Sequence, residues 1–219
     1  MTETIREVLD FWFSDEAKAY WFEASPAFDQ TIRKRFGELF ARAVTGELES
    51  WESSPEGSLA LCILLDQMPR NMFRGDASAF IADDKALAVA ERAIRAGFDQ
   101  SLPADRQQFL YLPFMHSEVL ANQMRALALC EAAKLRDAAG HAAGHLRIIR
   151  RFGRFPHRNA ILGRPSTPEE LDFLEESSQS FGQAARAEAA PADGDPPAAA
   201  ASDQPLRLKG LRKDPEAEP

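Results

Sequence analysis

Apolar residues recur every three or four positions along most of the chain, which is the period of one face of an α-helix. Ile5, Val8, Leu9 and Trp12 follow this spacing and predict a first helix that ends near Ser14. No stretch shows the apolar and polar alternation with β-branched residues that is typical of a strand. The pattern therefore predicts an all-α protein.

Proline, glycine and capping residues divide the helical pattern into further segments. Pro69 is expected to end one helix, and Pro113 is expected to start another. The predicted segments after the first helix are 26–45, 55–68, 84–96, 105–112, 113–130, 141–152 and 168–174. About seven to nine helices with short connections indicate an array of antiparallel helix pairs.

The composition changes beyond about residue 183, where Ala, Pro, Asp and Gly predominate and aromatic residues are absent. Such a segment buries too little apolar surface to offset the entropy of ordering it. We therefore expect one domain over 1–180 and a disordered tail over 181–219. A small basic patch in the tail is either solvated or a short docking or anion-binding segment: Arg207, Lys209, Arg212 and Lys213.

Charge and cysteine usage exclude several classes of protein. The net charge of −8 argues against a nucleic-acid partner, which needs a basic surface. The longest apolar run, 59–65, is far shorter than the roughly 20 residues that span a bilayer, and no secretory signal is visible. Cys62 and Cys130 lie in apolar helical segments and predict buried thiols. We expect a reduced, cytoplasmic protein without a membrane partner.

One segment reverses the overall charge, because residues 138–168 contain no Asp or Glu but six arginines and three histidines. Arginine donors on a Gly- and Pro-bounded loop suit a carboxylate or phosphate ligand. The same cations could instead oppose a helix dipole or join two helices through ion pairs. The two interpretations are about equally supported. The residues are Arg147, Arg150, Arg151, Arg154, Arg158, Arg164, His141, His145 and His157.

Two further segments carry polar groups. Asp66 could pair locally with Arg70, or it could orient a histidine while Arg70 binds an anion. Asn71 fits a helix cap better than a ligand contact. His116 falls within the helix predicted from Pro113, where it would share a face with Gln123, and an interior histidine is the simpler interpretation. Residues 68–71 resemble 155–159, which suggests two similar helix-to-helix turns.

Signatures of metal and cofactor binding are weak or absent. His141 and His145 have the i, i+4 spacing of a helical metal site, but no glutamate lies between them and no cysteine pair is near. No phosphate-binding loop, dinucleotide fingerprint or nucleophile elbow is present. We therefore predict neither a metal nor a cofactor.

Four segments, 8–13, 64–71, 112–118 and 151–159, together resemble the bacterial DUF924 family over about residues 5–176. The resemblance implies a right-handed, tetratricopeptide-like helical array. Met68 and Met115 stand where the family pattern has Phe and Glu. The family's polar signature is matched by Asp66, Arg70, Asn71, His116, Glu118, His145, Arg154, His157, Arg158 and Asn159.

The leading hypothesis is one cavity that binds a small anionic ligand. Its binding residues would be Arg70, Asn71, Gln123, His145, Arg154, Arg158 and Asn159. An acid/base enzyme would use the same cavity, with His116 or His157 oriented by Asp66 or Glu118. One rival is an interaction module whose concave face binds an extended peptide. The other is that the Arg and His motifs only join helices.

Overall fold

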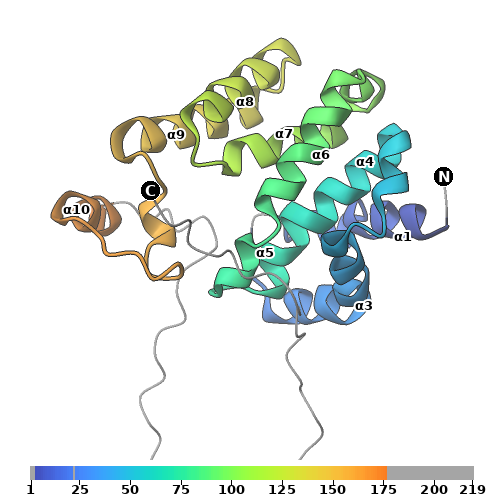
Figure 1. Ribbon diagram of the computed structural model, residues 1–219, viewed down its shortest axis with the longest axis horizontal. Coiled ribbons are helices and arrows are strands. Elements are labelled where there is room, and N and C mark those ends of the chain that lie inside the picture. The colour runs from blue at the N-terminus through green and yellow to red at the C-terminus, as the bar shows by residue number, and fades with distance from the viewer. Residues whose placement is uncertain (1–2, 22, 177–219) are drawn as a thin grey trace, which may run out of the picture. The chain divides into compact units, whose positions relative to one another are not determined.

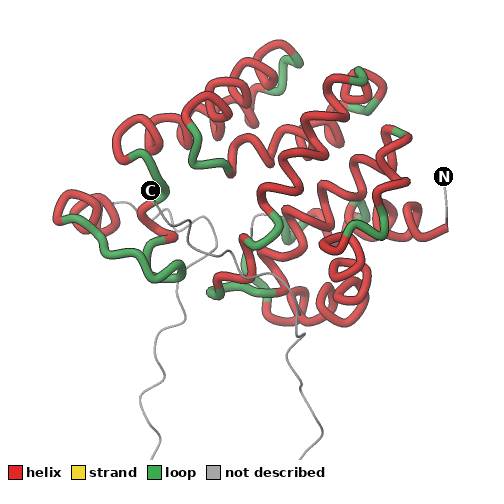
Figure 2. Tube along the Cα trace, viewed as in Figure 1, coloured by secondary structure: helices red, strands yellow, loops and turns green. Residues whose placement is uncertain are grey.

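The computed structural model describes residues 3–21 and 23–176, and these residues belong to one compact unit (Figure 1). Helices and their connections make up the whole described part of the chain, where no strand occurs, so the predicted all-α class is confirmed (Figure 2). No helix within the described ranges is long and apolar enough to cross a membrane. The predicted tail 181–219 and its basic patch lie outside the described residues.

The N-terminal helices are α1 (Glu3–Trp12), α2 (Asp15–Lys18) and α3 (Pro26–Thr45). Ser25 caps α3 by accepting a hydrogen bond from the N–H of Phe28. Gly46 ends the helix in the left-handed conformation, with φ of 91°. Both ends of α3 therefore agree with the signals in the sequence.

The expected break at Pro69 is wrong, because the helix continues through it. α4 (Pro55–Cys62) runs into a π-helical segment, η2 (Ile63–Gln67), which leads directly into α5 (Met68–Met72). Proline lacks an N–H and crowds the preceding turn, and the wider π turn relieves that conflict without ending the helix. The wide turn also carries the fully buried Asp66.

The expected boundary at Pro113 is also wrong. α6 (Asp83–Arg95) is followed by α7 (Ala104–His116), and Pro113 lies in the last turn of α7, where few helical residues follow it. His116 ends α7, while Gln123 belongs to α8 (Leu120–Ala132), so the two do not share a helix face. α9 (Arg136–Phe152) begins earlier than expected.

Short 3-10 helices connect the longer elements: η1 (Glu49–Ser53), η3 (Ala77–Phe80), η4 (Phe98–Ser101) and η5 (Pro156–Arg158). The last described helix is α10 (Pro168–Glu176). α8 packs against α7 and α9, and α6 packs against α4 and α7 (Figure 1). A large apolar core joins α1 to α9, and a smaller cluster around Ile149 and Phe155 joins the end of α9 to the segment after it.

Candidate functional site

A cavity of about 250 Å³ is lined by residues of α5, η3, α7, α9 and η5. All four histidines of the chain contribute to its wall: His116, His141, His145 and His157. Arg70, Asn71 and Arg158 line it as well, and Phe80 and Leu112 provide apolar surface. The structure thus brings together at one cavity residues from all three of the polar segments seen in the sequence.

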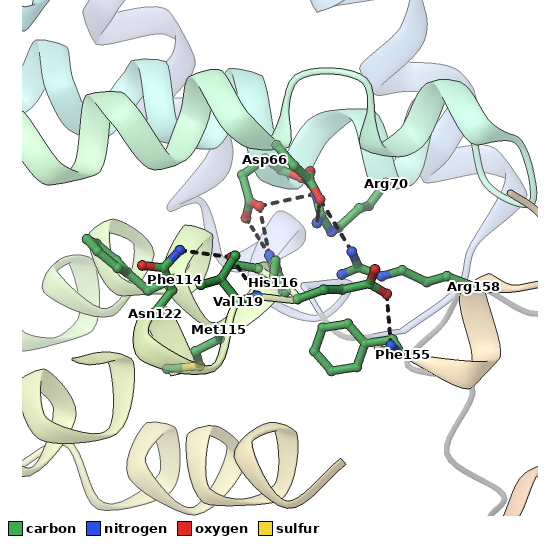
Figure 3. A network of polar contacts seen from close by, with 12 residues as sticks. Asp66, Arg70, Phe114, Met115, His116, Val119, Asn122, Phe155 and Arg158 are labelled. Atoms are coloured by element: carbon green, nitrogen blue, oxygen red, sulfur yellow. Dashed lines mark hydrogen bonds and ion pairs between the residues drawn. The ribbon is translucent and has the colours of Figure 1, made fainter. Parts of the chain in front are cut away.

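Asp66 and His116 form a buried dyad beside this cavity. His116 Nδ1 lies 2.7 Å from Asp66 Oδ1 and 3.0 Å from Oδ2 (Figure 3). Arg70 approaches the same carboxylate at 3.1 Å, and the amide of Gln67 donates to it. Burial opposes ionisation of Asp66, but Arg70 and the bonds from His116 and Gln67 outweigh it and hold its pKa well below the usual value. Asp66 is therefore a carboxylate that orients His116.

Arg70 and Arg158 meet at one aspartate, Asp83, the first residue of α6. Arg70 binds it through two hydrogen bonds of 3.0 Å, one to each oxygen. Arg158 reaches Asp83 Oδ2 only at 3.5 Å. Both guanidinium groups also lie against the ring of Phe80, at 5.6 and 4.6 Å from its centroid. Arg70 in α5 and Arg158 in η5 therefore converge here. The expectation of two similar helix-to-helix turns is wrong, because residues 68–71 lie within α5.

Arg158 is the least well paired charge at the cavity. It is only 6% exposed and lies between the rings of Phe80 and Phe155, each 4.6 Å from its guanidinium carbon. Its Nε is buried and has no hydrogen-bond partner among the described residues. Burial, and then the positive charge of Arg70, lower the pKa of Arg158 to about 10.

Three of the cavity histidines, His116, His145 and His157, are neutral at pH 7. Burial lowers the pKa of His116 and of His145 to about 4, and the pKa of His157 to about 3. The charge of Arg158 contributes in the same direction for all three. His145 Nδ1 lies 2.8 Å from the backbone carbonyl oxygen of His141, which can only accept, so Nδ1 donates.

Several residues predicted to bind or react with a ligand instead join segments of the chain. Glu118 accepts two hydrogen bonds from Arg164, at 2.6 and 2.9 Å, and one from the backbone N–H of Phe155 at 2.8 Å. Arg154 binds Glu170 through two bonds of 2.6 and 2.7 Å. Neither Glu118 nor Arg154 lines the cavity.

The three side-chain amides predicted to bind a ligand also form hydrogen bonds that join segments of the chain. Asn159 is buried, donates to Glu170 at 3.2 Å and does not line the cavity. Gln123 donates to the backbone carbonyls of Met115 and Ser117, at 2.6 Å each, and so holds the end of α7. Asn71 does line the cavity, where its amide donates to Asp29 at 2.9 Å. Its role in the structure is thus a tie at the cavity wall.

The sequence did not identify Asp83, which pairs with both arginines, or several residues of the cavity wall, among them Phe80, Trp21, Arg74 and Gln108. The predicted helix 84–96 starts after Asp83, whereas in the structure Ala82 is the N-cap and Asp83 is the first residue of α6. The ion pairs of Asp83 with Arg70 and Arg158 are tertiary contacts that local sequence does not show. Within the described residues, no three His, Cys, Asp or Glu side chains are arranged to hold a metal ion.

A family model described as a bacterial protein of unknown function, DUF924, matches residues 8–178. The chain belongs to the DUF924 family. The solved structure of a protein of unknown function, ATU0120 from Agrobacterium tumefaciens, is 43% identical to this DUF924 protein, with a TM-score of 0.76. The similarity covers 80% of this chain and 98% of that chain. A comparison with curated proteins found no match.

Proposed function

We propose that the cavity of this DUF924 protein binds a small anionic ligand, a carboxylate or a phosphate, with Arg158 as its main anion contact. The observation that carries the proposal is the incomplete hydrogen bonding of a guanidinium group that is almost fully removed from solvent. A guanidinium offers five N–H donors, and burying such donors without acceptors is unfavourable. A ligand oxyanion in the cavity would supply acceptors to the part of this guanidinium that lines it.

Arg164, which lies in the same segment, shows the contrasting arrangement of a structural arginine. It donates to both oxygens of Glu118, to the side-chain oxygen of Asn159 at 3.1 Å and to the carbonyl of Phe155 at 3.3 Å. Among the described residues Arg158 makes none of these bonds, and besides its ring contacts it has the long ion pair to Asp83. The difference supports a ligand-binding role for Arg158 and a structural role for Arg164.

The volume of the cavity also favours a small ligand over an extended peptide. Sites for drug-sized molecules usually measure about 300–1,000 Å³, and this cavity measures about 250 Å³. A peptide-binding helical array would instead need a long, open groove. The aromatic and aliphatic residues in the wall would pack against the apolar part of a metabolite.

The dyad supports acid/base chemistry at the same place. His116 is in hydrogen-bond contact with a buried carboxylate, Asp66. The carboxylate fixes the ring and stabilises the imidazolium that forms when His116 accepts a proton. Glu118, the other proposed carboxylate, is engaged by Arg164. We therefore propose His116 as the proton-transfer group of any reaction in the cavity.

The test is the binding of phosphate and acetate to the full chain, measured by thermal shift in an anion-free zwitterionic buffer. A ligand at ten times its Kd would stabilise the protein by about 1.4 kcal/mol, or roughly 3–6 °C. Arg158→Met should abolish the shift. Arg151→Met removes the same charge from a half-exposed residue outside the cavity and should retain it. An equal shift in wild type and Arg158→Met would disprove the proposal.

A further inference from the structure

The protonation of His116 is set by its partner. Ionised Asp66 can only accept hydrogen bonds, so the ring nitrogen that faces it, Nδ1, carries the proton. A neutral imidazole has a single N–H, and Nε2 is then left with a lone pair and no proton. His116 is therefore an obligatory acceptor at Nε2 as long as the ring stays neutral.

The ring of His116 forms part of the cavity wall. His116 lines the cavity, and because Nδ1 is turned onto Asp66, Nε2 lies on the opposite edge. Nε2 has no hydrogen-bond partner among the described residues, and its ring is in contact with that of His145, with centroids 6.2 Å apart. An acceptor of this kind needs a donor from whatever occupies the cavity.

The cations around His116 have the opposite hydrogen-bonding character to its Nε2 atom. Arg70 and Arg158 present only N–H donors, and both lie close enough to influence the protonation of His116. An anion held by these donors brings oxygen acceptors toward them. If the same ligand turned another bare oxygen toward Nε2, two lone pairs would face each other without a proton between them.

We propose that the ligand of this cavity carries a hydrogen-bond donor, an O–H or N–H group, beside its anionic group, and that His116 accepts that bond through Nε2. This inference rests on the proposed anion-binding function and specifies its ligand class: phosphate monoanions, phosphomonoesters with a protonated oxygen, or hydroxylated carboxylates. A site with a fixed acceptor discriminates against analogues that lack the donor, because its polar group is then left unpaired. Asp66 is a positioning residue in this account, acting through His116.

Phosphate and sulfate provide a matched pair, because they have nearly the same shape but only phosphate carries an O–H near neutral pH. Calorimetric titration of the full chain with each should give at least about fivefold tighter binding of phosphate. Pairs of acids extend the test to ligands of different length: glycolate against acetate, 3-hydroxypropionate against propionate, and 4-hydroxybutyrate against butyrate. At least one hydroxylated acid should bind more tightly than its parent by a similar factor.

His116→Phe keeps an aromatic ring but removes the acceptor, so it should abolish the preference while anions still bind through Arg158. Arg151→Met changes a half-exposed residue outside the cavity and should retain the preference. A preference that persists in His116→Phe would assign the acceptor to another group of the wall, such as Glu23, and overturn the inference. Nitrogen-15 NMR of the wild type tests the same point without a variant, since a proton on Nε2 of His116 would overturn it.

The two proposals fail in different ways. Equal binding of the donor-bearing and donor-free members of every pair, with loss of both in Arg158→Met, would overturn this inference and leave the anion site intact. Absence of binding of every anion in the series would overturn the anion site and this inference with it.

Discussion

Replacing Arg158 by methionine should leave the DUF924 protein at least as stable as the wild type, although it removes a buried ion pair. Burial and the positive charge of Arg70 lower the pKa of this guanidinium to about 10, which corresponds to about 3 kcal/mol of net unfavourable interaction for the charged form. Two ring contacts, with Phe80 and Phe155, offset part of this by about 1–3 kcal/mol in total. Asp83 keeps its two hydrogen bonds from Arg70.

The expected net effect is a gain of about 0–2 kcal/mol, or a rise in Tm of roughly 0–8 °C for a chain of this size. Arg164→Met is the matched control, with the same change of residue six positions along the chain. It leaves the carboxylate of Glu118, 28% exposed, with only a backbone N–H as partner. We expect this variant to lose about 1–3 kcal/mol.

Both variants should be compared with the wild type by calorimetry in a buffer free of phosphate, sulfate and carboxylates, because a bound anion would stabilise only the proteins that retain Arg158. A fall in Tm of Arg158→Met as large as that of Arg164→Met would refute the reasoning. Arg158 would then be a structural tie, and its incomplete hydrogen bonding would no longer support an anion site.

Other predictions address the dyad, the histidines and the fold. Because His116, His145 and His157 have folded-state pKa values of about 4, 4 and 3, below the unfolded value near 6.5, their contribution to stability is complete above pH 6.5 and declines as pH falls toward 4, by up to about 1.4 kcal/mol per histidine per pH unit. A Tm that stays level from pH 7.5 to 5 would contradict this. Asp66→Asn should place an amide donor against His116 Nδ1 and move the ring proton to Nε2, and an unchanged nitrogen-15 spectrum for that ring would show that Asp66 does not set the tautomer. Gly57→Ala would drive a Cβ into the backbone oxygen of Trp51 and should destabilise the protein by about 2 kcal/mol or more, whereas Gly140→Ala, in α9 with open space around it, should stabilise it by about 0.5–1 kcal/mol. Urea unfolding of the two glycine variants would disagree with this account if their order were reversed.

Helices whose ends are determined by local capping were predictable from the sequence. Ser25 and Gly46 act on backbone groups within a few residues, so the ends of α3 follow from the residues themselves. Pro69 and Pro113 misled the prediction because the effect of a proline depends on what surrounds it. At Pro69 a π turn absorbs the conflict, and at Pro113 the helix is already ending. Neither circumstance is visible in local sequence.

The site was predictable as a set of residue types but not as a set of contacts. The hypothesis that Asp66 orients a histidine matches the contact with His116, although the alternative, a local pair with Arg70, is present too. Arg154 and Arg158 have the same chemistry and lie four residues apart, yet one binds Glu170 and the other lines the cavity. Only the direction of each side chain separates them, and that depends on the turn at Gly153 and on tertiary packing.

The ties of the segment after α9 explain how a poorly paired guanidinium can be held in place. Arg154 on Glu170 and Arg164 on Glu118 fix this segment on both sides of Arg158, and all four side chains make close, charge-assisted bonds. Without such ties, a segment carrying an unsatisfied cation would move until the cation reached water. A supporting shell that is fully bonded allows one central group to stay incompletely bonded, which is how binding sites are preorganised for a ligand. The two ion pairs that do not reach the cavity, Arg154 with Glu170 and Arg164 with Glu118, therefore help to hold Arg158 in position.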